Sequence, residues 1–403
     1  MSKNYRTDPT FTGRIGSDTV NYPYGDSQND TGSNDGMPHI KTRADDILGF
    51  LQSILVAANL TPNGNADTAL ASQYLDGLKA IMAQGKKNYI TNADMSVAQR
   101  GTSFTLPIFT GPVSEFTLDR WECEVSGSAG AQLAVSQETF TVTGPTIPAP
   151  SPYYIKLAPT ATVSSMAIRQ TIEWPTPLLE QEVTVSFYAN VTADKVINVG
   201  VTVEADDGSS GSPDGENITI LAASGWARYS ATLHVNAPAS AETYTEDSHL
   251  ILEFLGGTDD VDLDITAIQL EVGSSETPFE KIERSQNLAE CQRFFQRYAL
   301  GDVFPGYWST SSEAFITVPF KVPMRAIPSL SSQGTNNNYR LATATPSFVG
   351  NATGSQTLNV FTDPVNLNQA LLTIDVVTSE GTAGHGTLLK LFGDAILDFS
   401  AEF

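Results

Sequence analysis

The sequence predicts a mainly β protein with five parts: an N-terminal extended arm, a short α-helical stem, a β-sandwich (jelly roll), a linking helix and a second C-terminal β domain. Two observations predict this. Apolar residues recur at helical spacing only within 42–85 and 285–300, whereas elsewhere after residue 86 they alternate with period two. The 403 residues are 40% hydrophobic and 17% charged, enough for more than one core. The expected boundaries are 1–41, 42–85, 86–280 and 281–403.

Composition excludes several classes of protein. The chain carries 45 acidic and 22 basic residues, a net charge of −23, which disfavours binding to nucleic acid or anionic membranes. Two cysteines, Cys123 and Cys291, cannot build a disulfide framework or a cysteine metal site, so we expect buried free thiols. The first residues lack the apolar core of a signal peptide, which predicts synthesis in the cytoplasm and no membrane insertion.

The first 41 residues are expected to form an arm. Residues 25–36 are nearly all turn formers and cannot fold alone. A purely solvating tail would have little use for aromatic residues, yet this segment contains Tyr5, Phe11, Tyr22 and Tyr24. We therefore expect the arm to become ordered against a partner.

Two short amphipathic helices are expected next. The first starts near Thr42 and ends before the break at 61–65, and the second covers about 66–84 and stops at Gly85. Their apolar stripes are too wide for one hairpin to cover, which predicts packing against other copies of the chain. The stem residues expected in this contact are Ile47, Leu51, Ile54, Leu55, Leu70, Tyr74, Leu78 and Ile81.

The β-sandwich is predicted from alternating segments at 182–190, 197–204, 227–235 and 249–255, with a long hairpin connection at 206–215. Such strands without intervening helices indicate a sandwich or jelly roll. A third helix is expected from Ser285 to Leu300, with Phe294, Phe295 and Tyr298 on its apolar side. Further strands are expected at 313–320, 370–377 and 388–392.

Several stretches resemble bacteriophage tail fibres. KTRADDILGF at 41–50 is similar to the virion-proximal part of such fibres, and NADMSVAQRG at 92–101 with TLDRW at 117–121 resembles the start of their jelly-roll module. IQLEVGSSETPFE at 268–280, followed by LAECQRFF at 288–295, resembles the junction between that module and a helix, and FKVPMRAIPS at 320–329 resembles a later strand. That module is in turn similar to bacterial carbohydrate-binding modules, and IRQTIE at 168–173, VTVSFY at 183–188 and GWARYS at 225–230 continue the resemblance.

The resemblance implies a phage tail fibre or receptor-binding virion protein, assembled as a homotrimer. It would attach to a phage tail or portal-proximal protein by its N-terminus, through Tyr5, Phe11, Tyr22 and Tyr24, and would recognise host cell-surface polysaccharide through its β domains. Two alternatives stay open: a purely structural virion spacer or adaptor without host contact, and a tailspike-type polysaccharide depolymerase. A secreted bacterial carbohydrate-binding protein fits least well.

No motif supports catalysis, so we expect a protein that is not an enzyme. The four histidines are scattered, and the sequence contains no HExxH, no GxSxG and no phosphate-binding loop. Carboxylates are too abundant to exclude a glycosidase pair by counting.

The sequence also leaves open that the β-sandwich binds a structural calcium ion. Asp260, Asp262 and Asp264 alternate along one predicted strand, which most simply indicates a solvated strand edge. The resemblance implies a calcium site in related jelly rolls, and Asn92 or Asp94 with Asp264 occupy the corresponding places.

Sugar binding normally uses an exposed aromatic face. The resemblance places Trp121 and Trp226 in scaffold motifs, so we expect both in the core. Trp174, beside Pro175, and the pair Tyr307 and Trp308 are the better candidates for glycan contact, although a structural role is the commoner one for such residues.

Overall fold

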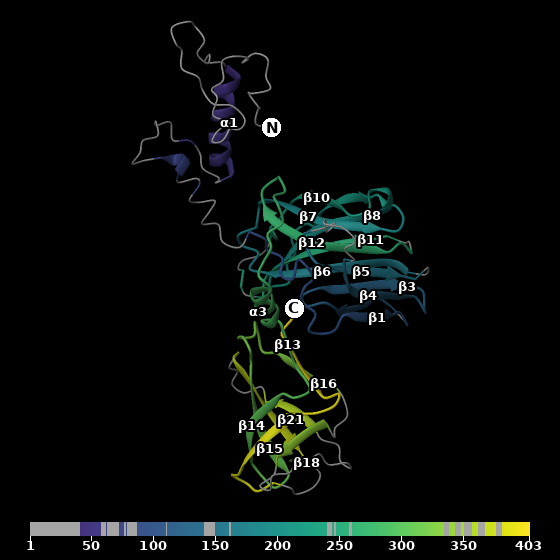
Figure 1. The fold of residues 1–403 in the computed structure, drawn as a ribbon, viewed down its shortest axis with the longest axis vertical. Helices are drawn as coiled ribbons and strands as arrows, with labels where there is room; N and C mark the ends of the chain where they lie inside the picture. The colour runs from purple at the N-terminus through teal and green to yellow at the C-terminus, as the bar shows by residue number, and fades with distance from the viewer. Residues whose placement is uncertain are drawn as a thin grey trace, which may run out of the picture. The chain divides into compact units, whose positions relative to one another are not determined.

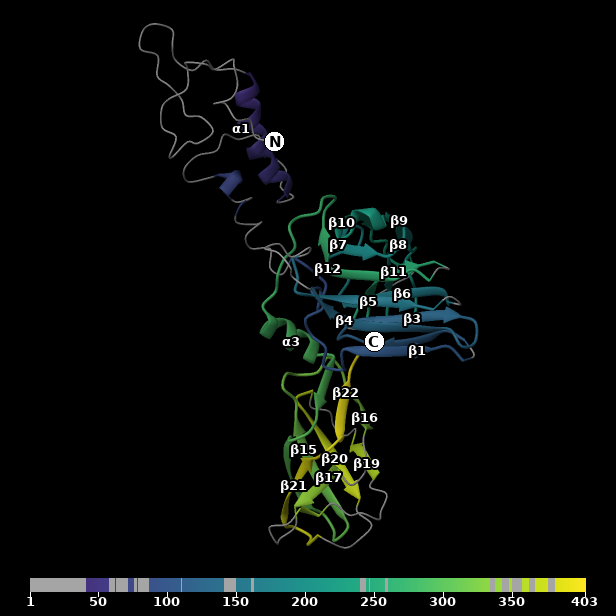
Figure 2. The ribbon, with the colours of Figure 1, turned by 45° about the vertical axis from the view of Figure 1, so that its right-hand side comes forward.

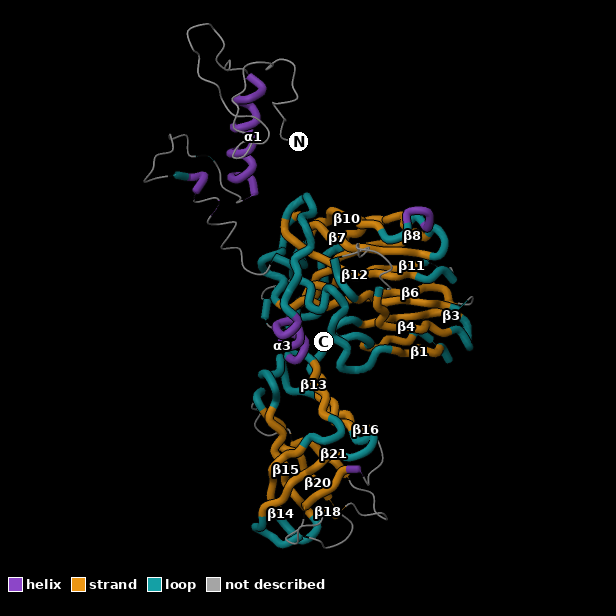
Figure 3. Tube along the Cα trace, viewed as in Figure 1, coloured by secondary structure: helices purple, strands orange, loops and turns teal. Residues whose placement is uncertain are grey.

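The computed structural model describes residues 41–57, 62, 72–75, 78, 87–109, 111–140, 150–160, 163–239, 244–245, 247–257, 260–333, 338–342, 348–349, 357–361, 367–375 and 381–403. The chain divides into two compact units, Met1–Lys86 and Lys87–Phe403. Strands dominate the second unit, in several antiparallel sheets (Figure 3), and this confirms the predicted mainly β fold class.

Helix α1 of the first unit spans Lys41–Ala57. Ile54 and Leu55 are buried, whereas Ile47, Phe50 and Val56 are exposed by 55%, 65% and 79%. The helix therefore presents apolar side chains that the described residues of its own unit do not cover. In the part of the chain that the structure describes, no helix has the length and apolarity needed to cross a membrane.

Two six-stranded sheets form the β-sandwich (Figure 1). We call the first sheet A, and its strands in spatial order are β1 (Ser103–Pro107), β4 (Gln132–Thr139), β5 (Tyr153–Pro159), β12 (Leu263–Val272), β7 (Glu182–Val191) and β10 (Ala227–His234). The second is sheet B, with β2 (Val113–Phe116), β3 (Glu122–Gly127), β6 (Val163–Glu173), β11 (His249–Gly256), β8 (Lys195–Glu204) and β9 (Asp214–Ile220). The short 3₁₀ helix η3 (Ala222–Ser224) precedes β10.

Alternation along the strands places one face of each sheet in a shared core. In β8, Val199, Val201 and Val203 are buried, while the residues between them are half-buried on the other face. Phe187 of sheet A and Phe254 of sheet B meet edge to face, with ring centroids 5.1 Å apart. Burying side chains of this size stabilises the fold by about 1.5–3 kcal/mol each, so the period-two pattern fixes which residues remain on the outer faces.

A second β domain follows (Figure 2). Its three-stranded sheet has the order β13 (Phe295–Tyr298), β22 (Ile396–Ser400), β16 (Ser329–Gln333). Its seven-stranded sheet has the order β18 (Phe348–Val349), β17 (Tyr339–Ala342), β21 (Gly386–Leu391), β14 (Val303–Trp308), β15 (Glu313–Pro319), β20 (Gln369–Asp375), β19 (Thr357–Phe361). Both sheets contribute to one core, which includes Phe304, Ile316, Leu372 and Phe399.

The linking helix is shorter than the sequence predicts. Helix α3 spans Arg284–Gln292, and the expected continuation to Leu300 is wrong, because Phe295–Tyr298 form strand β13 instead. These residues pair with β22, and Phe295 and Tyr298 are buried. Aromatic residues suit a half-buried pleated surface as well as a helix, so the pairing partner decides.

Glu271 anchors the segment that closes the sandwich after β12. Its carboxylate is 2% exposed and accepts hydrogen bonds from Gln269 Nε2 (2.7 Å), the Thr277 amide (2.9 Å) and Thr277 Oγ1 (2.6 Å), with Lys87 Nζ at 3.3 Å. Burial alone would raise the pKa of Glu271, but these partners outweigh it and hold the pKa below its usual value.

We expect Glu271→Gln to lower the free energy of unfolding by about 1.5–3 kcal/mol, the usual worth of hydrogen bonds to a charged group. A lowered pKa in the folded state gives stability that is present above the unfolded pKa and is lost as the pH falls through the folded pKa. The difference between wild type and variant should therefore be largest at neutral pH and shrink below about pH 4.5. Urea denaturation across pH measures it, with the exposed Glu276→Gln as control. A difference that grows on acidification would contradict this account.

Both cysteines are free and buried, as predicted. Burial raises the pKa of Cys123 to about 12, with an opposing contribution from Thr117, and raises the pKa of Cys291 as well. Neither thiol is placed to act as a nucleophile.

Candidate functional site

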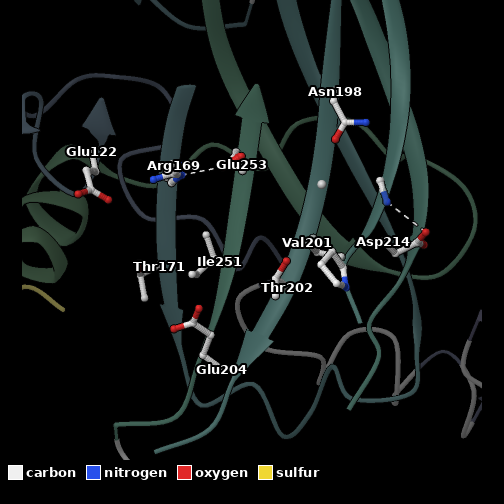
Figure 4. A pocket seen from close by; sticks show the side chains of 13 residues that line it. Glu122, Arg169, Thr171, Asn198, Val201, Thr202, Glu204, Asp214, Ile251 and Glu253 are labelled. Atoms are coloured by element: carbon white, nitrogen blue, oxygen red, sulfur yellow. Dashed lines mark hydrogen bonds and ion pairs between the residues drawn. The ribbon is translucent and has the colours of Figure 1, made fainter. Parts of the chain in front are cut away.

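The outer face of sheet B carries an open groove of about 510 Å³ (Figure 4). It crosses β3, β6, β11, β8 and β9, five neighbouring strands that together span about 19 Å. It is lined by Glu122, Arg169, Thr171, Asn198, Gly200, Val201, Thr202, Glu204, Pro213, Asp214, Gly215, Ile251 and Glu253. Since this lining contains no aromatic ring, the groove offers hydrogen bonds and small apolar surfaces rather than stacking.

Two facing glycines hollow the groove at one end. Gly200 of β8 pairs with Gly215 of β9, so no side chain rises between them. A Cβ atom added at Gly215 would lie 2.8 Å from Asn198 Oδ1, and one added at Gly200 would lie 3.4 Å from the same atom. The absence of both Cβ atoms leaves the backbone open to a ligand and makes room for the Asn198 amide.

Arg169 forms the centre of the groove. Its Nε donates to Glu253 Oε2 at 2.6 Å and its Nη1 donates to Glu124 Oε2 at 2.7 Å, and Figure 4 shows it facing Glu253 across neighbouring strands. Burial alone would lower the pKa of this guanidinium, but the two carboxylates outweigh it and raise the pKa. Two of its nitrogens are thus fixed, and among the described residues Nη2 has no acceptor, so a ligand can use it.

Beside Arg169 lies a row of side chains that alternate between polar and apolar. The register places Ile251 of β11 between Thr171 of β6 and Thr202 of β8, so one apolar side chain is flanked by two hydroxyl groups. The next row places His249 between Glu173 and Glu204, with His249 Nε2 3.4 Å from Glu204 Oε2. The arrangement can hydrogen-bond a hydroxyl-rich ligand while a small apolar patch contacts its carbon face.

Comparison with known proteins gives weak likenesses. No protein-family model matches the chain, and no curated protein matches it in sequence. A tailspike protein 4 enzymatically active domain of bacteriophage CBA120 superposes with a TM-score of 0.29 and 11% identity, over 46% of this chain and 21% of that one. A protein of Bacteroides thetaiotaomicron named a putative sugar binding protein superposes with a TM-score of 0.29 and 13% identity, over 46% of this chain and 100% of that one.

A family 11 carbohydrate-binding module of a Clostridium thermocellum cellulase gives a TM-score of 0.26 and 13% identity, over 44% of this chain and 97% of that one. Likenesses of this size establish no shared function. What the groove binds is therefore argued from its own residues.

The aromatic residues predicted to contact glycan are separated by the structure. Trp174 follows Glu173 at the end of β6, the strand that carries Arg169 and Thr171, and is 52% exposed with its backbone in the left-handed region (φ 55°). Tyr307 is 51% exposed on the outer face of the seven-stranded sheet of the second β domain, beside Phe315. Trp308 was wrongly predicted to contact ligand, because it points inward from β14 and is 2% exposed in the core of the second domain.

The two remaining tryptophans differ in burial. Trp121 is fully buried, as predicted, and its Nε1 donates to the Asn92 carbonyl at 3.0 Å. Trp226, predicted to be core, is not: it is half-buried outside the core, where its ring lies 5.1 Å from Tyr154 and 4.9 Å from Phe140. These three rings form an aromatic cluster on the outer face of sheet A.

The candidate calcium ligands do not fit a cation. Asn92 uses its amide within the fold: Nδ2 donates to the carbonyls of Val97 and Asp119, and Oδ1 accepts from the Val97 amide. Asp94 Oδ1 accepts from Asn287 Nδ2 at 3.1 Å. In the described part of the chain, no group of three or more His, Cys, Asp or Glu residues could hold a metal ion.

Asp264 makes contacts of its own, on sheet A. The predicted solvated edge is wrong, because β12 lies between β5 and β7 and Asp264 is 8% exposed. Its Oδ2 accepts from Asn190 at 3.1 Å, and Oδ1 lies 3.9 Å from Lys156 Nζ, which bonds Asp262 at 2.6 Å. Burial raises the pKa of Asp264, against the lowering effect of Asn190 and Lys156.

Several residues predicted to make contacts lie outside the described residues: Tyr5, Phe11, Tyr22 and Tyr24, predicted to anchor the virion, and Leu70 and Ile81, predicted for the contact between stems. Of the other predicted stem residues, Ile47 and Leu78 are exposed, Leu51 and Tyr74 are half-buried, and Ile54 and Leu55 are buried.

Sequence reasoning missed the groove residues. Period-two alternation places Asn198, Gly200 and Thr202 on one face of a strand, but a polar outer face is common to most antiparallel sheets. The alignment of Thr171, Ile251 and Thr202 depends on which strands pair and in which register. The signal that could have drawn attention to the groove is Gly200 inside the alternating segment at 197–204, because glycine inside a strand marks close approach of another backbone or a ligand. Gly215 stands at the end of the expected hairpin connection, where a glycine carries no such signal.

Proposed function

We propose that the β-sandwich binds a glycan in the groove of sheet B, and that this recognition serves attachment to a host cell surface. The observation that carries the proposal is the row Thr171–Ile251–Thr202 next to the clamped Arg169. Sugars present hydroxyl groups around a ring whose carbon face is apolar, which this row complements. The role is binding without catalysis.

The contact would be weak at a single site. Hydrogen bonds between a sugar and a wet, open groove replace bonds to water, so each adds about 0.5–1.5 kcal/mol. A multivalent assembly compensates, because several weak sites on one particle bind a dense surface far more tightly than one site does.

The proposed setting is a phage tail fibre, assembled as a homotrimer and held by its N-terminus to a tail or portal-proximal protein of the virion. The sequence resemblance supports this, as do the exposed apolar residues Ile47, Phe50 and Val56 of α1, which a second copy would cover. The host partner would be a cell-surface polysaccharide.

Thr202→Val tests the groove with a substitution that keeps side-chain shape and strand propensity. Losing one hydroxyl contact should weaken glycan binding about fivefold, measured by calorimetry with glycans found on a microarray. Thr232→Val on β10, an exposed threonine of the other sheet, is the matched control and should change nothing. Equal affinity of the Thr202→Val variant and the wild type for every glycan bound would contradict the proposed site.

A further inference from the structure

The charges along the groove are unbalanced. Four carboxylates line it, those of Glu122, Glu204, Asp214 and Glu253, against one guanidinium, that of Arg169. Because Arg169 also bonds Glu124 outside the lining, its positive charge is shared between two carboxylates. A ligand placed in the groove therefore meets a negative potential, in a chain whose net charge is −23.

Three of the four carboxylates are held in place by hydrogen bonds rather than free to turn away. Asp214 accepts hydrogen bonds from the His234 amide (2.6 Å) and from the Gly215 amide (3.1 Å). Glu122 accepts from Ser114 Oγ at 2.5 Å, and Glu253 is fixed by Arg169. An acidic group on a ligand could reach only Arg169 Nη2, because Nε and Nη1 already donate to carboxylates, and it would lie near these like charges.

We infer that the groove selects glycans without acidic groups: hydroxyl-rich sugars that are neutral or carry amines, and not uronic acids, sialic acids, sulfates or phosphates. This rests on the proposed function. Ionised carboxylates accept short, strong hydrogen bonds from hydroxyl groups, so the lining that repels an anion also favours a neutral sugar. Discrimination arises from repulsion of the wrong ligand as well as attraction of the right one.

A glycan microarray that contains neutral and acidic glycans tests the inference with the full chain. Binders should lack acidic groups, and reduction of the carboxylates of an acidic polysaccharide to alcohols should raise its affinity about tenfold or more. Higher salt should narrow that difference by screening. If no glycan binds, the proposed function fails and this inference falls with it. If acidic glycans bind as tightly as their reduced forms, the charge selection alone is overturned.

A variant pair separates local from overall charge. Glu122→Gln with Glu204→Gln removes two charges from the lining, whereas Glu115→Gln with Glu182→Gln removes two exposed charges outside it. The ratio of neutral to acidic affinity should fall about tenfold in the first variant and less than twofold in the second. Equal effects of the two variants would overturn the assignment of selectivity to the groove.

Discussion

Replacing Glu402 with alanine should lower the free energy of unfolding by about 3–5 kcal/mol, because it leaves two buried arginines without their carboxylate. The Glu402 side chain is 4% exposed and pairs with Arg120 (2% exposed) and with Arg100 (9% exposed, 3.3 Å). Arg100 Nη1 and Arg120 Nε are already buried without a hydrogen-bond partner, so the site has no spare acceptor. Burial lowers the pKa of the Arg100 guanidinium, against the raising effect of Glu402.

Glu402, Arg100 and Arg120 lie at the junction between the sandwich and the second β domain, and two aromatic rings pack against the arginines there. Arg100 lies over the Phe295 ring at 3.7 Å and Arg120 over the Phe294 ring at 3.5 Å. These residues belong to the stretches at 92–101, 117–121 and 288–295 that carry the resemblance to tail fibres, and the structure brings all three together. Part of the resemblance therefore lies in the residues that join the two β domains.

Urea denaturation measures the effect of Glu402→Ala, with Arg293→Ala as the matched control. Arg293 is 46% exposed and bonds Glu173 at 2.9 Å, so losing that surface pair should cost no more than about 1 kcal/mol. Similar losses in the two variants would show that the buried cluster does not hold the domains together.

Gly200→Phe should abolish glycan binding, with a loss of affinity of about a hundredfold or more, while the protein stays folded. The ring would rise between the Arg169–Glu253 pair and Gly215 and would fill space that a sugar needs. Gly200 lies on an outer face where an added Cβ atom meets nothing closer than 3.4 Å, so the fold tolerates it. A ligand excluded by bulk loses all its contacts at once, whereas a missing hydroxyl removes one.

Val196→Phe is the matched control for Gly200→Phe. Val196 belongs to the same strand, is 52% exposed and lies outside the lining of the groove. The control should bind glycan as the wild type does, and thermal unfolding should show both variants folded. Retained binding in a folded Gly200→Phe variant would place the glycan elsewhere.

The sequence anticipated the sandwich where a pattern was long and regular. The segments 182–190 and 249–255 became β7 and β11 with ends within one residue, because alternation over seven or more residues specifies both the element and its buried face. The stretch at 294–298 failed because its aromatic spacing satisfies a helix and a strand alike, and pairing with β22 decided between them.

The positions of the functional side chains were harder to predict from the sequence than the strands themselves. Tyr307 and Trp308 are neighbours on one strand, so they must face opposite sides, and the phase of β14 decides which ring is exposed. That phase is visible only once Phe304, Gly306 and Trp308 are seen to face the core. Asp264 likewise resembles a solvated acid until β12 is seen to lie between two other strands.

Methyl NMR on the chain labelled at isoleucine δ1 tests the central claim most directly, because Ile251 lies in the groove of sheet B. Titration with a glycan that binds should shift the Ile251 methyl signal and leave Ile316 and Ile374, in the core of the second domain, unchanged. A saturable titration in which Ile251 stays fixed while other methyl signals move would contradict the assignment of glycan binding to this groove.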